Sequence, residues 1–321
     1  MVNERVLATL CFWAALARPA TLLEIHQWLV PSRTQAHAVS LGQVQVALEE
    51  LILAGVVHTQ FGFYLLASCP PEWCERRIEQ EKETVQTDRE FLPALRWVQA
   101  VPFVRAVLAS GSLALETCTP QSDWDVFVVA RSGRLYTARM GLTMMAWALG
   151  RLRTKRSVVV RDLFCLNHYV ADGALELGHH SLYVAHVLGR LVPSYDIYGY
   201  ANNLWQANAW ARMLVPGVDG PPPPHRLRSV RDSFILKYLR RVGEWVLGGA
   251  LGDALERFMM HMQVRRIVRG SSFGGRIQAT LTEIEFHPHS HERTVVERTN
   301  EYLAHYDLQK YSIEDSGLDP R

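Results

Sequence analysis

Two apolar runs, joined through a glycine-serine turn and two aspartates, limit the folds that this chain can adopt. Val104–Ala109 is a short β-prone run that ends at Ser110-Gly111-Ser112. After a gap of ten residues, Asp123-Trp124-Asp125 leads directly into Val126–Val129. A short, continuous apolar run bounded by turn residues is typical of a strand buried on both faces. The sequence therefore predicts a sheet that carries polar groups at the ends of its buried strands.

The two aspartates are expected to form a cation site. Asp123 and Asp125 are two residues apart, and on a strand this spacing directs both carboxylates to the same face. Two carboxylates held close together repel each other, so both remain ionised only if a cation lies between them. Hard oxygen ligands of this kind suit Mg²⁺ or Mn²⁺.

The glycine-serine turn is expected to hold phosphate. Gly111 lets the backbone approach a ligand closely, and backbone N–H groups at such a turn can bind phosphate oxygens. The Ser112 hydroxyl adds one more donor. A phosphate-binding turn that faces a metal-binding pair is what phosphoryl or nucleotidyl transfer requires. The alternative is a plain Gly-Ser turn beside an unrelated surface Asp-x-Asp turn, which is disfavoured because Asp125 opens a strand.

Gly111-Ser112 followed by Asp123-Trp124-Asp125-Val126 resembles the signature of the DNA polymerase β-type nucleotidyltransferase superfamily. The resemblance covers about residues 103–170, and Ser110 is more polar than the residue that often precedes the glycine. It implies a metal-dependent nucleotidyltransferase that binds ATP or another nucleoside triphosphate. Gly111 and Ser112 would hold the β and γ phosphates. An acceptor hydroxyl would attack the α phosphate and release pyrophosphate.

The resemblance also implies a third carboxylate on a later strand, where it often activates the attacking hydroxyl. Asp162 is our choice, because it follows the β-prone run Ser157–Arg161 and opens the apolar stretch Leu163–Leu166. It would then join Asp123 and Asp125 as a catalytic residue and metal ligand. Asp172 and Glu176 are weaker candidates. If Asp162 only caps a turn, the site is incomplete, and the chain is better interpreted as a non-catalytic regulator that binds a nucleotide or nucleic acid.

The first part of the chain shows the element order of a winged helix-turn-helix. The expected elements are three helices and a hairpin: residues 4–17, 22–29 and 41–54, then strands at 56–59 and 61–66 around Gly62. The module either binds DNA or serves in packing or dimerisation. Residues 1–68 carry three arginines against four glutamates, and the third helix contains Glu49 and Glu50 without a basic residue. A DNA-binding surface is normally basic, so the charge favours the packing role.

The whole chain is expected to be an α+β protein with a mixed-sheet core. The expected parts are a winged-helix-like module at 1–70, connecting helices at 71–100, a nucleotidyltransferase core at 101–180 and a mainly helical region at 181–321. Residues 72–86 are expected to form a solvated helix that precedes a second helix carrying Phe91 and Leu95. Apolar residues make up 48% of the chain and charged residues 21%, which is ordinary for a folded globular protein.

The charge distribution bears on the acceptor. The net charge is only +2, yet the interval between Asp125 and Asp162 holds eight basic residues and no acid. A small molecule or a protein side chain is favoured as acceptor over nucleic acid. A nucleic-acid acceptor would need a continuous basic track, and the aromatic residues of the C-terminal region are spaced as a core. The oligomeric state stays open, a homo-oligomer included.

The remaining signals concern location and other metals. Five scattered cysteines fit a reducing cytoplasm, and no apolar run is long enough to span a bilayer, so no membrane partner is expected. The apolar run at residues 6–17 resembles part of a signal peptide, but Glu4 argues against this interpretation. His287, His289 and His291 could present imidazoles to zinc, although a polar loop is the favoured interpretation.

Overall fold

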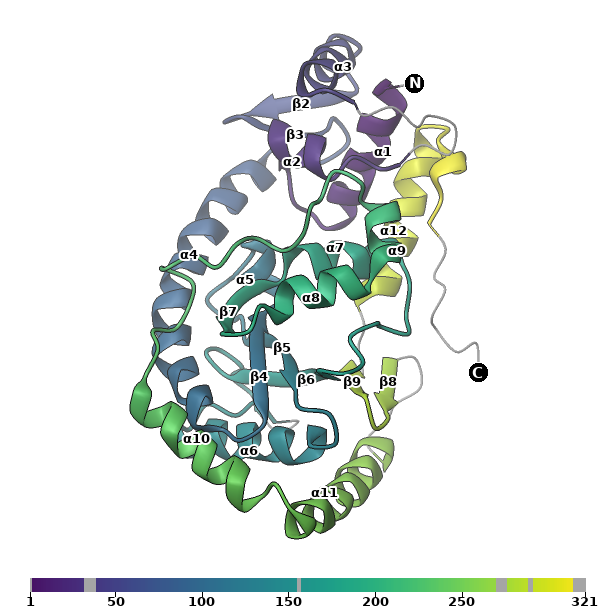
Figure 1. Ribbon diagram of the computed structural model, residues 1–321. Helices are drawn as coiled ribbons and strands as arrows, with labels where there is room; N and C mark the ends of the chain where they lie inside the picture. Colours follow the sequence, from purple (N-terminus) through teal and green to yellow (C-terminus); the bar gives the residue numbers. More distant parts are fainter. Residues whose placement is uncertain (1, 32–38, 155–156, 270–275, 288–290, 314–321) are drawn as a thin grey trace.

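The computed structural model describes residues 2–31, 39–154, 157–269, 276–287 and 291–313. The chain is a mixed α/β protein, 53% helical and 15% strand, which confirms the expected combination of helices with a mixed sheet. An N-terminal module of helices and a small sheet lies at one end of the molecule, and a larger sheet with its own helices forms the rest (Figure 1). No helix among the described residues is long and apolar enough to cross a membrane.

The N-terminal module contains the expected three helices and hairpin. Its elements are α1 (Val2–Ala15), β1 (Ala20–Thr21), α2 (Leu22–Gln27), α3 (Leu41–Leu53), β2 (Val57–Gln60) and β3 (Phe63–Leu66). The strands form an antiparallel sheet of order β1-β3-β2. Thr21 and Ser40 cap α2 and α3 through their hydroxyls, and each forms a reciprocal capping box with the third residue of its helix. These caps explain why the two helix starts could be predicted from the sequence.

A single long helix, α4 (Glu72–Leu95), replaces the two connecting helices that we expected, and a short 3₁₀ turn, η1 (Arg96–Ala100), follows it. The helix continues without a break through Thr87 and Asp88, which are buried. Asp88 accepts a 2.9 Å hydrogen bond from Arg228 Nε. At its other end, Arg77 donates to Glu24 of α2 at 2.7 Å, so α4 joins the N-terminal module to the main sheet.

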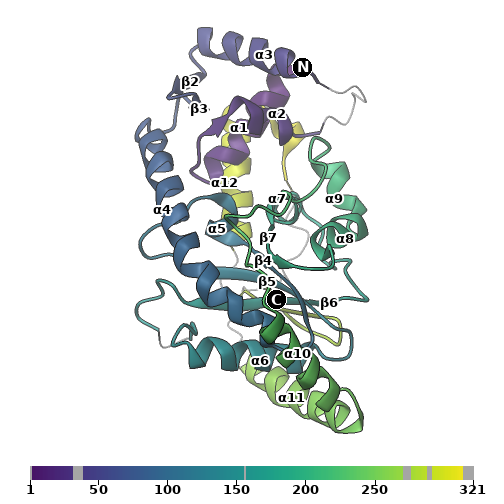
Figure 2. The same ribbon diagram turned by 60° about the vertical axis from the view of Figure 1, so that its left-hand side comes forward.

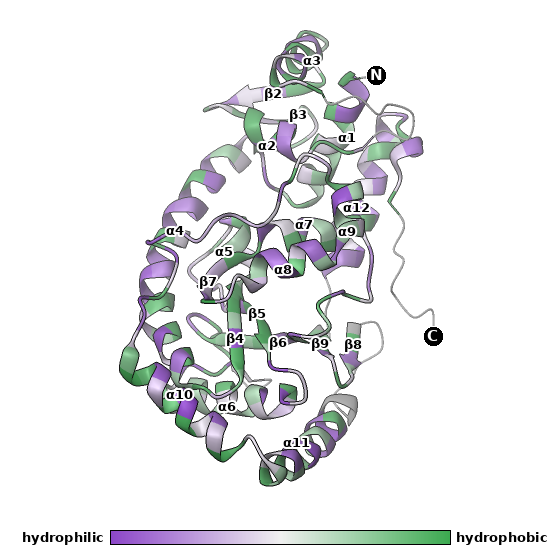
Figure 3. Ribbon diagram, viewed as in Figure 1, coloured by the Kyte–Doolittle hydropathy of each residue, from purple (hydrophilic) through white to green (hydrophobic). Residues whose placement is uncertain are grey.

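The main sheet has six strands in the order β7-β4-β5-β6-β9-β8. Their bounds are β4 (Val104–Ala109), β5 (Trp124–Ala130), β6 (Phe164–Ala171), β7 (Val192–Asp196), β8 (Arg276–Ala279) and β9 (Glu283–His287). Within this sheet, β5 and β6 are parallel and the other neighbours are antiparallel. The two apolar runs that the sequence singled out are therefore adjacent central strands, and β5 appears as a hydrophobic strand in Figure 3.

The sheet corrects two expectations. The run Ser157–Arg161 is not a strand, and β6 begins only at Phe164. The core does not end at residue 180, because β7, β8 and β9 from the supposedly helical C-terminal region complete the same sheet. β7 was hard to predict because it is short and contains Pro193. Proline is tolerated there because β7 lies at the sheet edge.

Helices cover both faces of the sheet. The remaining helices are α5 (Gly111–Leu115), α6 (Leu135–Ala148), α7 (Leu182–Arg190), α8 (Tyr200–Ala207), α9 (Ala209–Leu214), α10 (Phe234–Val246), α11 (Ala250–Arg269) and α12 (His291–His305), with a 3₁₀ turn η2 (Gln309–Tyr311). Trp124, Val126 and Val128 face the core formed with α4 and α6. Phe127 and Val129 face the opposite core, which includes α7 and α8. Figure 2 shows α4 and α6 on one side of the strands and α7 and α8 on the other.

Candidate functional site

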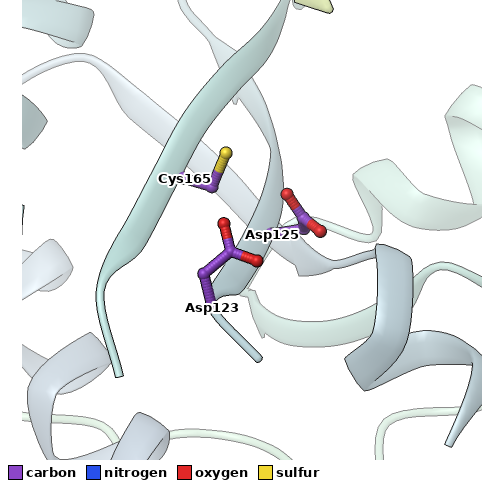
Figure 4. Close-up of side chains that lie close together, drawn as sticks. All are labelled: Asp123, Asp125 and Cys165. Carbon is purple, nitrogen blue, oxygen red and sulfur yellow. The ribbon is translucent and has the colours of Figure 1, made fainter. Parts of the chain in front are cut away.

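Three side chains that could bind a metal ion converge where β5 and β6 begin. Asp123 immediately precedes β5, Asp125 is its second residue, and Cys165 is the second residue of β6. The parallel register pairs Asp125 with Cys165. One carboxylate oxygen from each aspartate and the Cys165 sulfur lie within 4.8 Å of one another. Figure 4 shows the two carboxylates and the thiol directed into the same space.

The glycine turn contacts this cluster directly. Gly111 has a φ of +55°, and a Cβ built on it would overlap the Oδ2 atom of Asp125. The backbone N–H of Ser110 donates a 3.0 Å hydrogen bond to the carbonyl oxygen of Asp125, which fixes the turn to the start of β5. Only glycine fits both the positive φ and the close approach at this position. The backbone of Gly111 therefore lies against the Asp125 carboxylate.

Ser112 lies in the first turn of α5, next to Gly111. Its hydroxyl oxygen accepts a weak contact from the Cys118 thiol at 3.7 Å, and the side chain is half-buried. Arg228 donates to the carbonyl of Leu113 at 2.6 Å and pairs with Asp88 and Glu116. These contacts hold α5 against α4, so the turn that carries Ser112 is supported by the surrounding fold.

A guanidinium group occupies the open side of the cluster. Arg153 forms an ion pair with Asp123, and the same Nη1 atom lies 3.5 Å from the Cys165 sulfur. The backbone N–H of Arg153 donates to the carbonyl of Phe164 at 3.2 Å, and the Phe164 N–H donates to the carbonyl of Arg151 at 2.7 Å. The segment before β6 is thus pinned beside the strand. Arg153 supplies the cluster with one positive charge.

The electrostatics reflect two carboxylates in a confined space. Burial and the neighbouring charge of Asp123 raise the pKa of Asp125 well above its ordinary value. Burial, followed by the charges of the two aspartates, strongly raises the pKa of the Cys165 thiol. Burial, the largest single effect, would lower the pKa of Arg153, but the combined influence of Asp123, Cys165 and Asp125 raises that pKa. The cluster therefore has more negative charge than its protein surroundings readily accommodate, which is the condition that favours a bound cation.

Asp162 is not part of this cluster. It lies in the turn before β6 with a φ of +57°, a conformation that aspartate tolerates better than most residues. Its carboxylate pairs with Arg151 at 3.5 Å and with Arg161 at 3.3 Å. The structure therefore places Cys165 beside the aspartate pair, in the region where a third carboxylate was expected. The expected strand before Asp162 does not form, so Asp162 remains in a turn.

The weaker candidates lie elsewhere. Asp172 follows β6 at the opposite end of that strand, where it accepts hydrogen bonds of 2.8 Å from the backbone and hydroxyl of Ser132. Glu176 is exposed and is not part of the cluster. Within the described ranges, Asp123, Asp125 and Cys165 are the only group of three clustered side chains that could bind a metal ion. His287 and His289 are among the residues whose side chains lie outside the described structure.

Cys165 is the site residue that the sequence did not indicate. Because β5 and β6 are parallel neighbours, the second residues of the two strands lie side by side. The order of the apolar runs indicates that these two strands are neighbours. Pairing Asp125 with Cys165 also requires β6 to begin at Phe164. His168, which follows the same run, pairs with Glu283 at 3.2 Å and its ring contacts Phe127. It is a partnered side chain of the sheet.

The basic interval between Asp125 and Asp162 is largely engaged within the fold. Arg134 pairs with Asp253, Arg139 donates to Gln263 at 2.8 Å, and Arg161 lies 3.7 Å from Glu83. Arg151 and Arg153 pair with aspartates near the cluster. These arginines therefore do not form a free basic track.

Comparison with known proteins gives no relative for this chain: no family model, no curated protein and no solved structure matches it. Its function is therefore inferred from the geometry of the cluster and its turn.

Proposed function

We propose that this chain is a metal-dependent nucleotidyltransferase whose site is built on Asp123, Asp125 and the Gly111-Ser112 turn. The observation that carries the proposal is the direct contact between the Gly111 backbone and the Asp125 carboxylate, with Asp123 beside it. A phosphate bound at the turn would lie next to a cation bound at the carboxylates. This adjacency is what phosphoryl-transfer chemistry requires.

The residues present fit a divalent cation. Two carboxylates meet in a partly buried space, and their mutual repulsion is relieved by a positive charge. Oxygen donors suit Mg²⁺ or Mn²⁺, and the softer Cys165 sulfur shifts the preference toward Mn²⁺. Bound there, the cation would supply charge neutralisation for the phosphates of the nucleotide.

The chain's own residues then hold the triphosphate. The backbone at Gly111 and the hydroxyl of Ser112 would donate to the β and γ phosphates. Arg153 is the nearest cationic side chain, and guanidinium groups bind phosphate oxygens well. The acceptor hydroxyl attacks the α phosphate, a new P–O bond forms, and pyrophosphate leaves. A role for Asp162 in deprotonating that hydroxyl requires its release from Arg151 and Arg161.

A second candidate is a non-catalytic regulator that binds a nucleotide or nucleic acid through the same site. The presence of Cys165 beside the aspartates and the pairing of Asp162 with two arginines favour it. In either case a small molecule or a protein side chain is the preferred partner at the acceptor side, because the arginines near the cluster are mostly paired. We also propose that the N-terminal module is a winged helix used in packing, and that the chain is cytoplasmic, where its five free cysteines would stay reduced.

The test is to incubate the full chain with each nucleoside triphosphate labelled at the α phosphate, with Mg²⁺ or Mn²⁺ and a metabolite, protein or RNA extract. Label that moves to an acceptor, and is lost in Asp123→Asn and Asp125→Asn, supports the enzyme. Metal-dependent nucleotide binding without transfer to any fraction supports the regulator. Binding that is unchanged in both variants would sink both candidates.

A further inference from the structure

The helix α10 (Phe234–Val246) presents an apolar face to solvent. Phe234 is 81% exposed, Trp245 83% and Ile235 71%. The exposed apolar residues of the helix are Phe234, Ile235, Tyr238, Leu239, Val242, Trp245 and Val246. At 100° per residue, these positions form one continuous arc of about 140°. Exposed apolar residues are common singly, but a contiguous stripe of this kind marks an interaction surface.

The orientation of α10 is set by polar contacts on its buried side. Arg240 is buried and donates to the Tyr195 hydroxyl at 2.8 Å. Glu244 accepts hydrogen bonds from Arg105 at 2.8 Å and from the backbone N–H of Phe103 at 2.9 Å. Gly243 lets the helix approach Pro102. The helix thus has Arg240 and Glu244 turned toward the protein and its apolar face turned outward, which is the reverse of an ordinary surface helix.

The surroundings of the apolar face are positively charged. Five exposed arginines in α10, α11 and the segment just before them form no ion pair with any described residue: Arg231, Arg241, Arg257, Arg265 and Arg266. Arg241 is one turn from both Tyr238 and Trp245, so it borders the apolar arc. The four acidic residues between 231 and 266 are all engaged: Asp232 with Lys237, Glu244 with Arg105, Asp253 with Arg134, and Glu256 with the backbone of Tyr136 and Thr137.

The next helix repeats the pattern. Leu251, Phe258 and Met262 of α11 are exposed at spacings of seven and four residues, which places them on one stripe. Arg265 and Arg266 follow Met262 by about one turn. Both helices lie at the end of the molecule opposite the N-terminal module (Figures 1 and 2). An apolar stripe with aromatic residues and bordering arginines is typical of a helix that lies in a membrane interface.

We propose that α10 is a docking surface for an anionic lipid membrane, on which the helix lies without crossing it. Phe234, Tyr238 and Trp245 would enter the headgroup region, and the unpaired arginines would face anionic headgroups. The absence of a spanning helix among the described residues concerns insertion across a bilayer and not adsorption to its surface. From the lengths of its apolar runs we expected no membrane partner. The exposed apolar face of α10 and the unpaired arginines beside it now lead us to infer one.

A second copy of the chain fits this surface less well. In a symmetric dimer this surface of one copy would meet the same surface of the other copy. The unpaired arginines of one copy would then face the unpaired arginines of the other. No unengaged acid between residues 231 and 266 is present to receive them. An anionic bilayer supplies both the apolar depth and the negative charge.

The experiment is flotation of the full chain with vesicles of pure phosphatidylcholine and with vesicles containing about one-third phosphatidylglycerol. We expect binding to the anionic vesicles that weakens as salt rises, with little binding to the neutral ones. The double variant Tyr238→Glu, Trp245→Glu should reduce the bound fraction at least about tenfold, because it places charges within the apolar arc. Arg231→Glu with Arg241→Glu should remove the preference for anionic lipid. Leu53→Glu, at an equally exposed leucine of α3, is the matched control.

Thermal unfolding of each variant separates loss of binding from loss of folding, and the exposed positions predict little change in Tm. Equal flotation of the wild type and the Tyr238→Glu, Trp245→Glu variant would overturn the proposal. So would a concentration-dependent dimer, measured by sedimentation without lipid, that the same variant dissociates. In that case the surface belongs to a second copy. Failure to float with either vesicle would likewise reject the membrane. None of these outcomes bears on nucleotide binding at the cluster.

Discussion

Asp125 and Cys165 are register partners on the parallel strands β5 and β6, so the start of one strand supplies a carboxylate and the start of the next a thiol. A neutral thiol contributes one negative charge fewer than a carboxylate would. The cluster therefore differs in charge from a set of three acids, and this difference is open to measurement by substitution.

Replacing either aspartate should abolish metal-dependent nucleotide binding. We expect Asp123→Asn and Asp125→Asn each to weaken Mn²⁺-dependent triphosphate binding by about 100-fold or more, because each removes a charged ligand. Isothermal titration calorimetry measures the effect. Glu176→Gln, at an exposed acid outside the cluster, is the control and should bind as the wild type does.

Asp162→Asn distinguishes the turn aspartate from the site. Its carboxylate pairs with Arg151 and Arg161, so its loss should leave metal-dependent nucleotide binding within about twofold of the wild type. Stability should fall by up to about 1 kcal/mol, since both arginines are partly exposed. A large loss of metal affinity in the same titration would instead return Asp162 to the metal site.

Cys165→Asp should change the metal preference. A third carboxylate adds a hard ligand and a negative charge, so we expect Mg²⁺ to bind about tenfold more tightly relative to Mn²⁺. Without metal the added repulsion should lower Tm, and saturating Mg²⁺ should restore it. Cys165→Ser, which keeps the size and adds no charge, is the matched control. If both variants keep the wild-type metal preference, Cys165 is not a ligand.

Gly111→Ala tests the contact between the turn and the carboxylate. Alanine at a φ of +55° is strained, and its methyl group would overlap the Asp125 carboxylate. We expect a loss of about 1–3 kcal/mol in the free energy of unfolding, together with loss of nucleotide binding. Gly62→Ala, at a positive φ with open space around it, should cost stability by strain alone and leave binding intact.

Glu24 gives the N-terminal module a pH dependence. Burial alone would raise the pKa of Glu24, but the charges and hydrogen bonds of Arg18 and Arg77 lower it to about 2. A depressed pKa stabilises the fold above the ordinary value of 4.5, and this contribution is lost as the pH falls from there toward 2. The linkage amounts to about 3 kcal/mol at neutral pH.

Urea unfolding of the wild type and Glu24→Gln at pH 7 and pH 3 measures this contribution. We expect the difference in unfolding free energy between the two proteins to shrink by about 2 kcal/mol at the lower pH. Glu49→Gln, at an exposed glutamate of α3, should show a much smaller change. An equal difference at both pH values would mean that Glu24 has an ordinary pKa.

The sequence predicted the local elements better than their assembly. The hydroxyl caps at Thr21 and Ser40 and the apolar runs of β4 and β5 are local signals, so these elements could be placed. The extent of the sheet could not, because β7, β8 and β9 are short strands that are stabilised by pairing with distant partners. Asp123 and Asp125 followed from two-residue spacing, whereas Cys165 depends on the register between two strands. Whether the cluster is catalytic stays a prediction.

The packing of α12 on α1 has a consequence for how the chain acquires its structure. Val295 and Leu303 of α12 belong to the same buried core as α1, and Lys310 pairs with Glu4. The module at the beginning of the chain is therefore finished by residues from its end. During synthesis about 290 further residues must follow α1 before α12 can cover its apolar surface. We expect the nascent module to depend on chaperones, and a fragment of residues 1–70 to aggregate when made alone.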